Sequence, residues 1–223
     1  MLRDNRLYDI VEAAGRLFVL KGYQQTQISD IAKASGIATG STYNLFASKK
    51  AIFQFVLKSI FDESTFDKEN TFPIAEMDTL DLEKQIIASF ETSMKGIFPQ
   101  TSGEDEQAPS FRDVLSKAFD FISKYGTGLL IFERNTSGWQ DLCEVYFQRR
   151  KTFIQAFEDC VERCIRKGEI RRLDQPEHHT RLIIETLSWW GMHVKYTYSD
   201  IHVETADAKK VVMDALIHAY ITP

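Results

Sequence analysis

Apolar residues recur at helical spacing near the start of the chain. Positions three, four and seven residues apart carry apolar side chains, namely Leu7, Ile10, Val11, Ala14, Leu17 and Phe18. This spacing places them on one face and predicts an amphipathic first helix. We expect the helix to end at Lys21, because a basic last turn followed by a glycine, here Gly22, is a common helix stop.

Two short helical segments follow. The segment ISDIAKAS (28–35) predicts a second helix, with Thr26 placed to cap its N-terminus. Ser35 and Gly36 form a tight turn, and a third short helix is expected over about 38–46. Two short helices joined by a glycine turn are the pattern of a helix-turn-helix unit.

A longer fourth helix is predicted over 49–65, with Ser48 as its N-cap. Apolar residues nearly encircle it, which predicts contacts on more than one side: Ile52, Phe53, Phe55, Val56, Ile60 and Phe61. This helix braces the two short ones. We therefore expect an N-terminal domain over 1–48 and a larger helical body over 49–223.

The body shows helical patterns almost throughout. A polar segment (67–81) and an acidic loop (99–110) interrupt them, and 126–137 is undecided. Asp174 as cap with Pro176 in the first turn predicts a helix start. The predicted body helices cover about 82–98, 111–125, 138–167, 176–198 and 204–221. The chain is therefore expected to be all-α.

The sequence lacks a targeting segment and a disulfide framework. No apolar run reaches the roughly 18–20 residues that span a bilayer, and the N-terminus does not read as a secretory signal, which predicts a cytoplasmic protein. Three cysteines form no paired set. Cys160 and Cys164 lie four residues apart on one predicted helix, either as small buried apolar residues or as a redox or soft-metal pair.

Charge is distributed unevenly along the chain. The net charge is −5, yet residues 1–50 carry seven Lys and Arg against four Asp and Glu. A basic front on an acidic body places any contact with a polyanion in the first fifty residues.

The third predicted helix has an unusual outer face. Helical geometry puts Ile37, Ala38, Ser41 and Leu45 on the inner side, and Thr39, Gly40, Tyr43 and Asn44 on or near the outer side. The outer side carries no charge and has short polar groups, which suits close approach to another surface. A helix fits the DNA major groove, where Asn44 can pair with adenine and Thr39 and Ser41 can reach base edges or thymine methyl groups. The Tyr43 hydroxyl can bind a phosphate.

Lys49 stands at the start of the fourth helix, where a cation is disfavoured by about 0.3–1 kcal/mol. A DNA phosphate at this helix N-terminus would reverse the effect, since it attracts both the lysine and the backbone N–H groups. Thr26 and Gln27, at the start of the second helix, offer another phosphate site.

The stretch from 7 to 53 resembles the N-terminal DNA-binding domain of TetR-type transcriptional regulators. The matching features occur in order and without gaps: Ala13-Ala14, Leu17-Phe18, Gly22-Tyr23, Thr26, Asp30-Ile31-Ala32, Gly36-Ile37, Gly40-Ser41, Tyr43, Phe46 and Lys49. The resemblance implies a homodimer that usually represses genes and leaves DNA when a small ligand binds. It maps the DNA contacts of the family onto Thr26, Thr39, Gly40, Ser41, Tyr43, Asn44 and Lys49.

The resemblance also implies a ligand pocket and a dimer interface in the body. Candidate pocket residues for a small, mostly apolar or aromatic effector are Phe90, Phe119, Phe132, Trp139, Phe147, Trp189 and His193, with Glu91, Glu133 and Glu185 as further polar members. His193 is expected in the interior. The apolar helices over about 176–221 are expected to pair with their copies, so that the operator is near-palindromic.

The sequence shows no motif of an enzyme. The chain carries no G-x-S-x-G, H-E-x-x-H, P-loop or dinucleotide motif, so we do not expect an enzyme, and no cofactor or metal is implied. A ligand-independent interaction module, or a regulator that requires a co-ligand to bind DNA, remains as the alternative on the same fold.

Overall fold

The computed structural model describes residues 5–99, 108–135, 137, 139–197 and 203–222. Every regular element within these ranges is helical, and strand pairing is limited to two isolated bridges, Phe46 with Ile74 and Ile170 with Ile221. The all-α prediction is thereby confirmed. Most of the predicted loop at 99–110, and Tyr198 at the end of a predicted helix, lie outside the described residues.

The chain divides into two compact units. The first comprises Met1–Ser89 with Thr127–Tyr146, and the second comprises Phe90–Gly126 with Phe147–Pro223. The boundaries fall inside three helices: α5 (Thr79–Ile97), α6 (Phe111–Arg134) and α7 (Gln140–Arg166). The expected division between 1–48 and 49–223 concerns function, and it stays a prediction.

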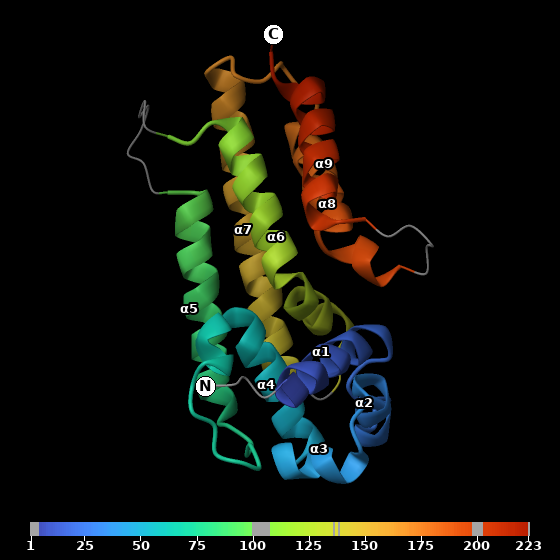
Figure 1. Ribbon diagram of the computed structural model, residues 1–223. Helices are drawn as coiled ribbons and strands as arrows, with labels where there is room; N and C mark the ends of the chain where they lie inside the picture. Colours follow the sequence, from blue (N-terminus) through green and yellow to red (C-terminus); the bar gives the residue numbers. More distant parts are fainter. Residues whose placement is uncertain (1–4, 100–107, 136, 138, 198–202, 223) are drawn as a thin grey trace. The chain divides into compact units, whose positions relative to one another are not determined.

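Four helices at the start of the chain belong to the first unit (Figure 1). They are α1 (Asn5–Leu20), α2 (Ile28–Ser35), α3 (Thr39–Leu45) and α4 (Lys49–Phe61). α1 packs against α2 and α4, and α2 packs against α3. The apolar faces predicted from the sequence meet in a core that includes Ile10, Phe18, Ile31, Leu45, Ile52 and Phe53.

Two details of the helix ends in this unit differ from the prediction. Gln27, and not Thr26, is the N-cap of α2. α4 ends at Phe61 instead of continuing to 65, because Asp62 leaves the helical conformation and its carboxylate accepts a hydrogen bond from Ser64 N at 3.0 Å. A short 3₁₀ turn, η1 (Glu63–Phe66), follows.

The undecided segment after residue 125 continues α6 to Arg134, so the predicted helix over 111–125 was too short. Its glycines do not break the helix, because neighbouring elements pack directly on them. A Cβ at Gly128 would lie 2.9 Å from a ring carbon of Phe61, and a Cβ at Gly126 would lie 2.6 Å from Met192 Cβ. The glycines therefore serve close packing and not a turn.

The helix predicted over 176–198 is also divided. α8 (Pro176–Ser188) passes into a π-helical turn, η2 (Trp189–His193), and then a 3₁₀ turn, η3 (Val194–Tyr196). Pro176 occupies the first turn as predicted, but the N-cap is Gln175 in a left-handed conformation, not Asp174. Proline disfavours the α conformation in the residue before it, which fixes the helix start at Pro176.

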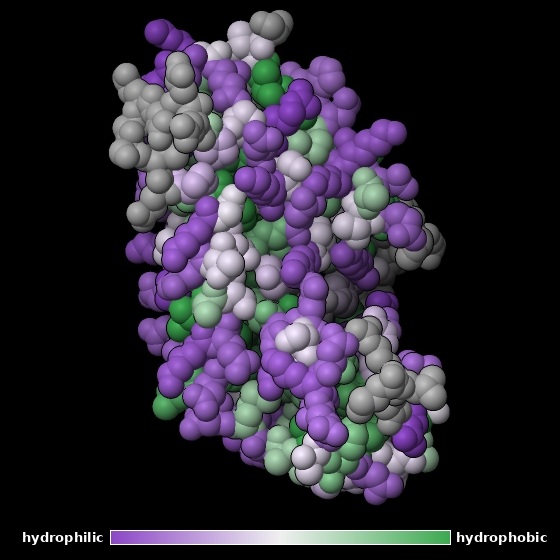
Figure 2. Space-filling model, turned by 60° about the vertical axis from the view of Figure 1, so that its left-hand side comes forward, coloured by the Kyte–Doolittle hydropathy of each residue, from purple (hydrophilic) through white to green (hydrophobic). Residues whose placement is uncertain are grey.

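Aromatic residues from different helices meet in the second unit. Its parts of α5, α6 and α7 run alongside one another (Figure 1), and Phe121 contacts Phe90 and Phe153 with ring centroids 5.3 and 5.9 Å apart. α9 (Thr205–Tyr220) packs against α8 and η2. Hydrophilic residues cover most of the face seen in Figure 2. None of the helices in the described ranges is both long and apolar enough to cross a membrane.

Candidate nucleic-acid interface

The outer face of α3 is open to solvent. Thr39, Gly40, Tyr43 and Asn44, here called the recognition face, are all exposed, and the Tyr43 side chain is 52% exposed. No atom lies within 4 Å of a Cβ built at Gly40. Chemically, the face presents hydroxyl and amide groups with no charge.

The inner face of α3 packs on the first unit through Thr42 and Leu45, which are 1% and 5% exposed. Ser41 lies between the two faces and is partly buried. Ala38 was expected on the inner side, but it is the exposed N-cap of the helix. Its position differs because the regular helical geometry begins one residue later.

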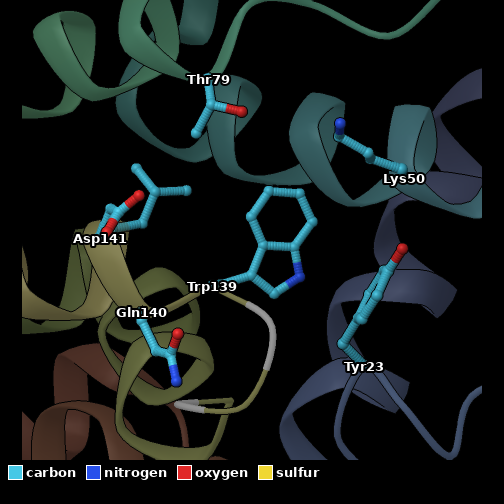
Figure 3. A pocket seen from close by; sticks show the side chains of 7 residues that line it. Tyr23, Lys50, Thr79, Trp139, Gln140 and Asp141 are labelled. Carbon is cyan, nitrogen blue, oxygen red and sulfur yellow. The ribbon is translucent and has the colours of Figure 1, made fainter.

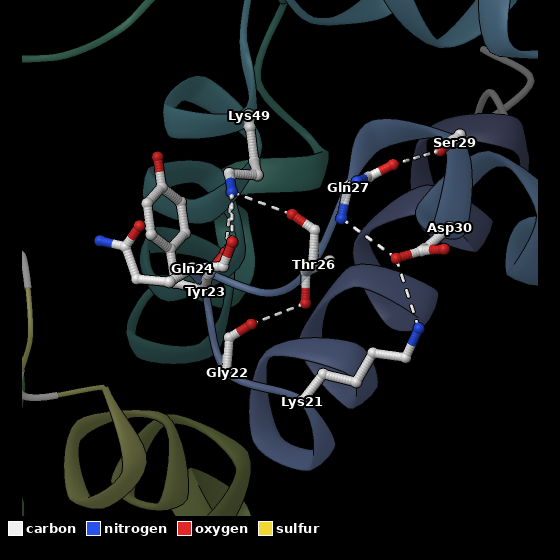
Figure 4. A network of polar contacts seen from close by, with 9 residues as sticks. All are labelled: Lys21, Gly22, Tyr23, Gln24, Thr26, Gln27, Ser29, Asp30 and Lys49. Carbon is white, nitrogen blue, oxygen red and sulfur yellow. Dashed lines mark hydrogen bonds and ion pairs between the residues drawn. The ribbon is translucent and has the colours of Figure 1, made fainter.

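Side-chain contacts hold the start of α2 in place (Figure 4). Gln27 N donates a hydrogen bond to Asp30 Oδ2 at 3.1 Å, and Lys21 Nζ lies 3.3 Å from the same oxygen. These two contacts, the Gln27 N–H first, lower the pKa of the Asp30 carboxyl group. The carboxylate thus remains charged at the N-terminus of α2, where the helix dipole favours it.

Thr26 is fully buried just before this helix. Its hydroxyl donates to Gly22 O at 2.7 Å, and its backbone N–H donates to the same carbonyl at 3.2 Å. Gly22 has a φ of 81°, a left-handed conformation that glycine adopts readily. Thr26 therefore closes the turn between α1 and α2, and its side chain does not reach the surface.

Lys49 ties α4 to the same turn. Its Nζ donates to the carbonyl oxygens of Tyr23 at 2.8 Å and Thr26 at 2.9 Å, and a longer contact of 3.5 Å reaches Gln24 O. The ammonium also lies 4.4 Å from the centre of the Tyr23 ring (Figure 4). Three carbonyl oxygens and an aromatic face offset the unfavourable helix dipole without a phosphate.

Ser48 and Lys50, at the start of α4, both contact Glu76. Ser48 caps the helix as predicted, accepting a hydrogen bond from Ala51 N at 3.1 Å. Its hydroxyl donates to Glu76 Oε1 at 2.7 Å, while Lys50 Nζ lies 3.1 Å from Glu76 Oε2. Together they lower the pKa of Glu76, with Ser48 as the larger cause.

Asn135 was missed by sequence reasoning. It lies just after α6 and is 5% exposed. Its Nδ2 donates to Phe18 O at 3.1 Å and Ile131 O at 2.7 Å, and its Oδ1 accepts a hydrogen bond from Tyr23 N. The neighbouring Arg134 donates to Val19 O at 3.0 Å. These contacts satisfy carbonyls at the end of α1, and no local pattern marks a residue more than a hundred positions away as their partner.

The comparison with known families agrees with this arrangement. Residues 10–56, which contain α2, α3 and most of α1 and α4, match the family described as bacterial regulatory proteins, tetR family. This stretch of the chain is a TetR-family DNA-binding domain. The resemblance stated from the sequence is confirmed, and so is the expectation that the protein is not an enzyme, because this is a family of regulators.

Two curated TetR-type relatives illustrate the similarity. The transcriptional repressor KstR2 of Rhodococcus jostii is 30% identical over 90 residues, which is 40% of this chain and 44% of that repressor. The match therefore spans less than half of the relative. The uncharacterised regulator YfiR of Bacillus subtilis is 24% identical over 170 residues, covering 76% of this chain and 70% of YfiR.

A solved structure extends the likeness of fold to the whole chain. The structure of the ketosteroid transcriptional regulator KstR2 of Mycobacterium tuberculosis superposes with a TM-score of 0.60 over 100% of this chain and 98% of the other. The two sequences are 18% identical in this superposition, so the comparison supports the fold alone.

The candidate effector residues of this protein fall into different environments. Phe90, Phe119, Phe132 and Trp139 are buried, whereas Phe147 and Trp189 are 45% and 50% exposed. His193 is partly exposed and stacks on Trp189 with ring centroids 6.0 Å apart, so the prediction of an interior histidine was wrong. Phe132 and Trp139 belong to the first unit and the others to the second. A single pocket formed by all seven stays a prediction.

Cys160 and Cys164 are each 1% exposed and are not disulfide-bonded. Among the described residues, no cluster of three or more His, Cys, Asp or Glu side chains accompanies them. Their burial is consistent with the reading as small apolar residues of α7.

Proposed function

We propose that the protein is a transcriptional repressor that binds a near-palindromic DNA operator as a homodimer and is released by a small, mostly apolar or aromatic effector. The observation that carries the proposal is the recognition face. It is exposed and carries no charge, on a helix whose inner side is packed and whose neighbour α2 is held by specific contacts. A helix of this kind suits the major groove.

The recognition face supplies the contacts to bases in this proposal. Asn44 has the amide that pairs with adenine N6 and N7, and Thr39 and Ser41 can reach nearby base edges. Gly40 lets the backbone approach the groove closely. Tyr43 is placed to bind a phosphate through its hydroxyl, which fixes the register of the helix on the duplex.

Thr26, Gln27 and Lys49, which lie at or contact the turn before α2, act on DNA binding in two ways in this proposal. Gln27 is exposed, and while its side-chain oxygen accepts a hydrogen bond from Ser29 Oγ at 3.4 Å, its side-chain NH₂ group can donate to a phosphate. Thr26 and Lys49 act through the protein, because the Thr26 hydroxyl and the Lys49 ammonium both bind backbone carbonyls. We infer that they position the start of α2 and thereby the recognition face.

Dimerisation is proposed through α8, η2 and α9. Large apolar side chains are exposed on these elements: Leu182, Trp189 and Val211. Two copies related by a two-fold axis would present two recognition faces to half-sites about 34–36 Å apart, which is one turn of DNA. Since operator DNA lies in the bacterial cytoplasm, we place the protein there.

Release by an effector requires only a modest free-energy difference. An effector that binds the DNA-incompetent state better by about 1–3 kcal/mol lowers operator affinity by roughly 5–150-fold. In this proposal, a shift of α4 carries the change, because α4 packs on α1 and is tied to the turn before α2 through Lys49.

Selection of bound sequences from a random duplex library tests the proposal. The purified protein is used at low and at near-physiological salt, beside Asn44→Ala and the control Gln85→Ala, which removes an exposed amide on α5. We expect one near-palindrome to be enriched by the parent and by the control at both salt concentrations. Asn44→Ala should relax the preference at one base pair of each half-site, since a bidentate contact contributes about 1–3 kcal/mol.

Uniform loss of binding with salt and no enriched sequence would contradict the proposal for the free protein. The interaction-module and co-ligand alternatives would then be preferred. Repeating the selection with a cell extract depleted of macromolecules separates these two, because only the co-ligand alternative predicts that a near-palindrome is recovered.

A further inference from the structure

The first unit contains a pocket of about 390 Å³ that is lined in part by Tyr23 (Figure 3). Tyr23 and Lys50 line one side, Thr79 at the start of α5 lines another, and the start of α7 closes it. Its volume lies within the range of small-molecule sites, about 300–1,000 Å³. The lining residues are Tyr23, Lys50, Thr79, Trp139, Gln140, Asp141 and Leu142, all within the first unit.

Trp139 in this pocket has an unsatisfied hydrogen-bond donor. The side chain is 8% exposed and stacks on Phe53 with ring centroids 4.4 Å apart. Its Nε1 is buried and has no hydrogen-bond partner in the described part of the chain. A buried N–H without an acceptor is destabilising, so such groups are rare in folded proteins.

The nitrogen edge of the indole is turned toward the side of the pocket where Tyr23 and Lys50 stand (Figure 3). The Tyr23 ring contacts the indole at nearly a right angle, with centroids 5.5 Å apart. The Tyr23 ring therefore packs against the indole, and both rings border the pocket. This combination suits a flat molecule that carries an oxygen acceptor.

The charged groups at the pocket are Lys50 and Asp141, and Glu76 lies beside Lys50. Glu76 is bound by Ser48 and Lys50, and the Asp141 carboxylate is exposed in the first turn of α7, where the helix dipole favours it. The first backbone N–H groups of α7 lack intrahelical acceptors, and they lie at the same end as Trp139. The lining does carry acceptors, such as the Asp141 carboxylate and the Gln140 amide oxygen, but none of them forms a hydrogen bond with Trp139 Nε1.

We propose that this pocket binds a small planar aromatic molecule whose carbonyl-type oxygen accepts a hydrogen bond from Trp139 Nε1. The aromatic part lies against Trp139 and the Tyr23 ring, and the Tyr23 ring moves aside to uncover the nitrogen. A neutral amide and a carboxylate share the required oxygen. The test distinguishes the two by titrating an amide and a carboxylate separately.

The pocket adjoins the contacts that position α2. Lys49 Nζ lies 4.4 Å from the centre of the Tyr23 ring and binds the Tyr23 carbonyl. A ligand that displaces this ring removes the cation–π contact and disturbs the turn before α2. We therefore expect the ligand to lower DNA affinity. This consequence rests on the proposed function, whereas the binding of the ligand to the pocket does not depend on it.

Indole N–H resonances provide a direct test of binding. The protein has three tryptophans, so the ¹⁵N–¹H spectrum contains three indole signals, and Trp139→Phe assigns one of them. Benzamide, benzoate and protonated benzylamine are titrated in the millimolar range. We expect benzamide or benzoate to move the Trp139 signal downfield to saturation, and benzylamine, which has no acceptor, to leave it in place.

Trp139→Phe keeps an aromatic ring and removes only the donor. It should weaken binding of the effective probe roughly tenfold, as measured by calorimetry, since a hydrogen bond contributes about 1–1.5 kcal/mol. Trp190→Phe, whose ring lies outside the pocket, should leave the affinity unchanged. Circular dichroism confirms that both variants fold.

The proposal is overturned if neither oxygen-bearing probe moves the Trp139 signal, or if benzylamine moves it equally. It is also overturned if Trp139→Phe binds the probe as tightly as the parent. Operator binding is then measured with saturating probe. Unchanged DNA affinity with a shifted Trp139 signal would uphold the site and count against the proposed release mechanism, so the two failures are distinguishable.

Discussion

Individual side chains that bind backbone carbonyls hold the parts of the first unit together. Lys49 joins α4 to the turn after α1, and Asn135 joins the end of α6 to the end of α1. The carbonyl groups that they bind lie mainly at or just after the end of α1, where intrahelical donors are lacking. Each is therefore a residue whose loss leaves buried acceptors without partners, which costs more than the bond itself contributes.

Asn135→Ala should lower the free energy of unfolding by about 2–4 kcal/mol, because it leaves Tyr23 N, Phe18 O and Ile131 O without a partner in a buried site. Urea unfolding followed by circular dichroism measures the effect. Asn70→Ala, whose amide makes an exposed local contact with Lys68 O, serves as the control. Equal midpoints for the two variants would contradict a structural role for Asn135.

Lys49→Met tests whether this lysine acts through protein or phosphate. Loss of its carbonyl contacts should weaken operator binding by about 1–2 kcal/mol while the slope of log affinity against log salt stays unchanged. A direct phosphate contact would instead reduce the slope by about 1. Lys84→Met on α5, whose charge is exposed, is the matched control, and binding is measured by fluorescence anisotropy over a range of salt.

Helices approach one another most closely where α6 carries glycine. Within the second unit Gly126 faces the π-helical turn η2, and within the first unit Gly128 faces the end of α4. In an exposed helix these glycines would cost about 1 kcal/mol each relative to alanine. Here the close packing that they permit offsets this cost.

Gly126→Ala should therefore destabilise the protein, although alanine is the better helix former. The new methyl group would lie 2.6 Å from Met192 Cβ and 3.3 Å from its Cα, so backbone must shift, at a cost of about 1–3 kcal/mol. Gly96→Ala in α5 has open space and should be neutral or stabilising by up to about 1 kcal/mol. Thermal unfolding compares the two, and a higher melting temperature for Gly126→Ala would refute the packing argument.

The apolar side chains exposed on α8 and α9 concern the molecule as a whole. Leu182 and Val211 are 57% and 59% exposed, and they stand on two helices that pack against each other. Two recognition faces are needed to read a near-palindrome, so association through α8 and α9 would link the oligomeric state to DNA affinity.

Leu182→Glu combined with Val211→Glu should convert the dimer to a monomer, because it places four carboxylates in a two-fold interface. Light scattering after size exclusion measures the mass, and operator affinity should fall at least tenfold. Leu80→Glu, an equally exposed leucine on α5, should change neither property. A double variant that remains dimeric would show that α8 and α9 are not the interface.

The sequence by itself determined helices α1 to α4 and identified the helix-turn-helix that they contain. Amphipathic spacing, the Ser48 cap and the Gly22 and Gly36 stops are local signals, so α1 to α4 were predicted to within a few residues. The chemistry of the recognition face was also readable, because exposure on a short helix follows from its period of 3.6 residues.

Only the tertiary structure decided which polar groups meet. The burial of Thr26, the carbonyl contacts of Lys49 and the role of Asn135 depend on partners up to 117 positions apart, which no local pattern specifies. The same holds for α6, whose glycines read as a break until their packing partners are known. Local periodicity determines elements, whereas contacts between distant segments depend on how the whole chain packs.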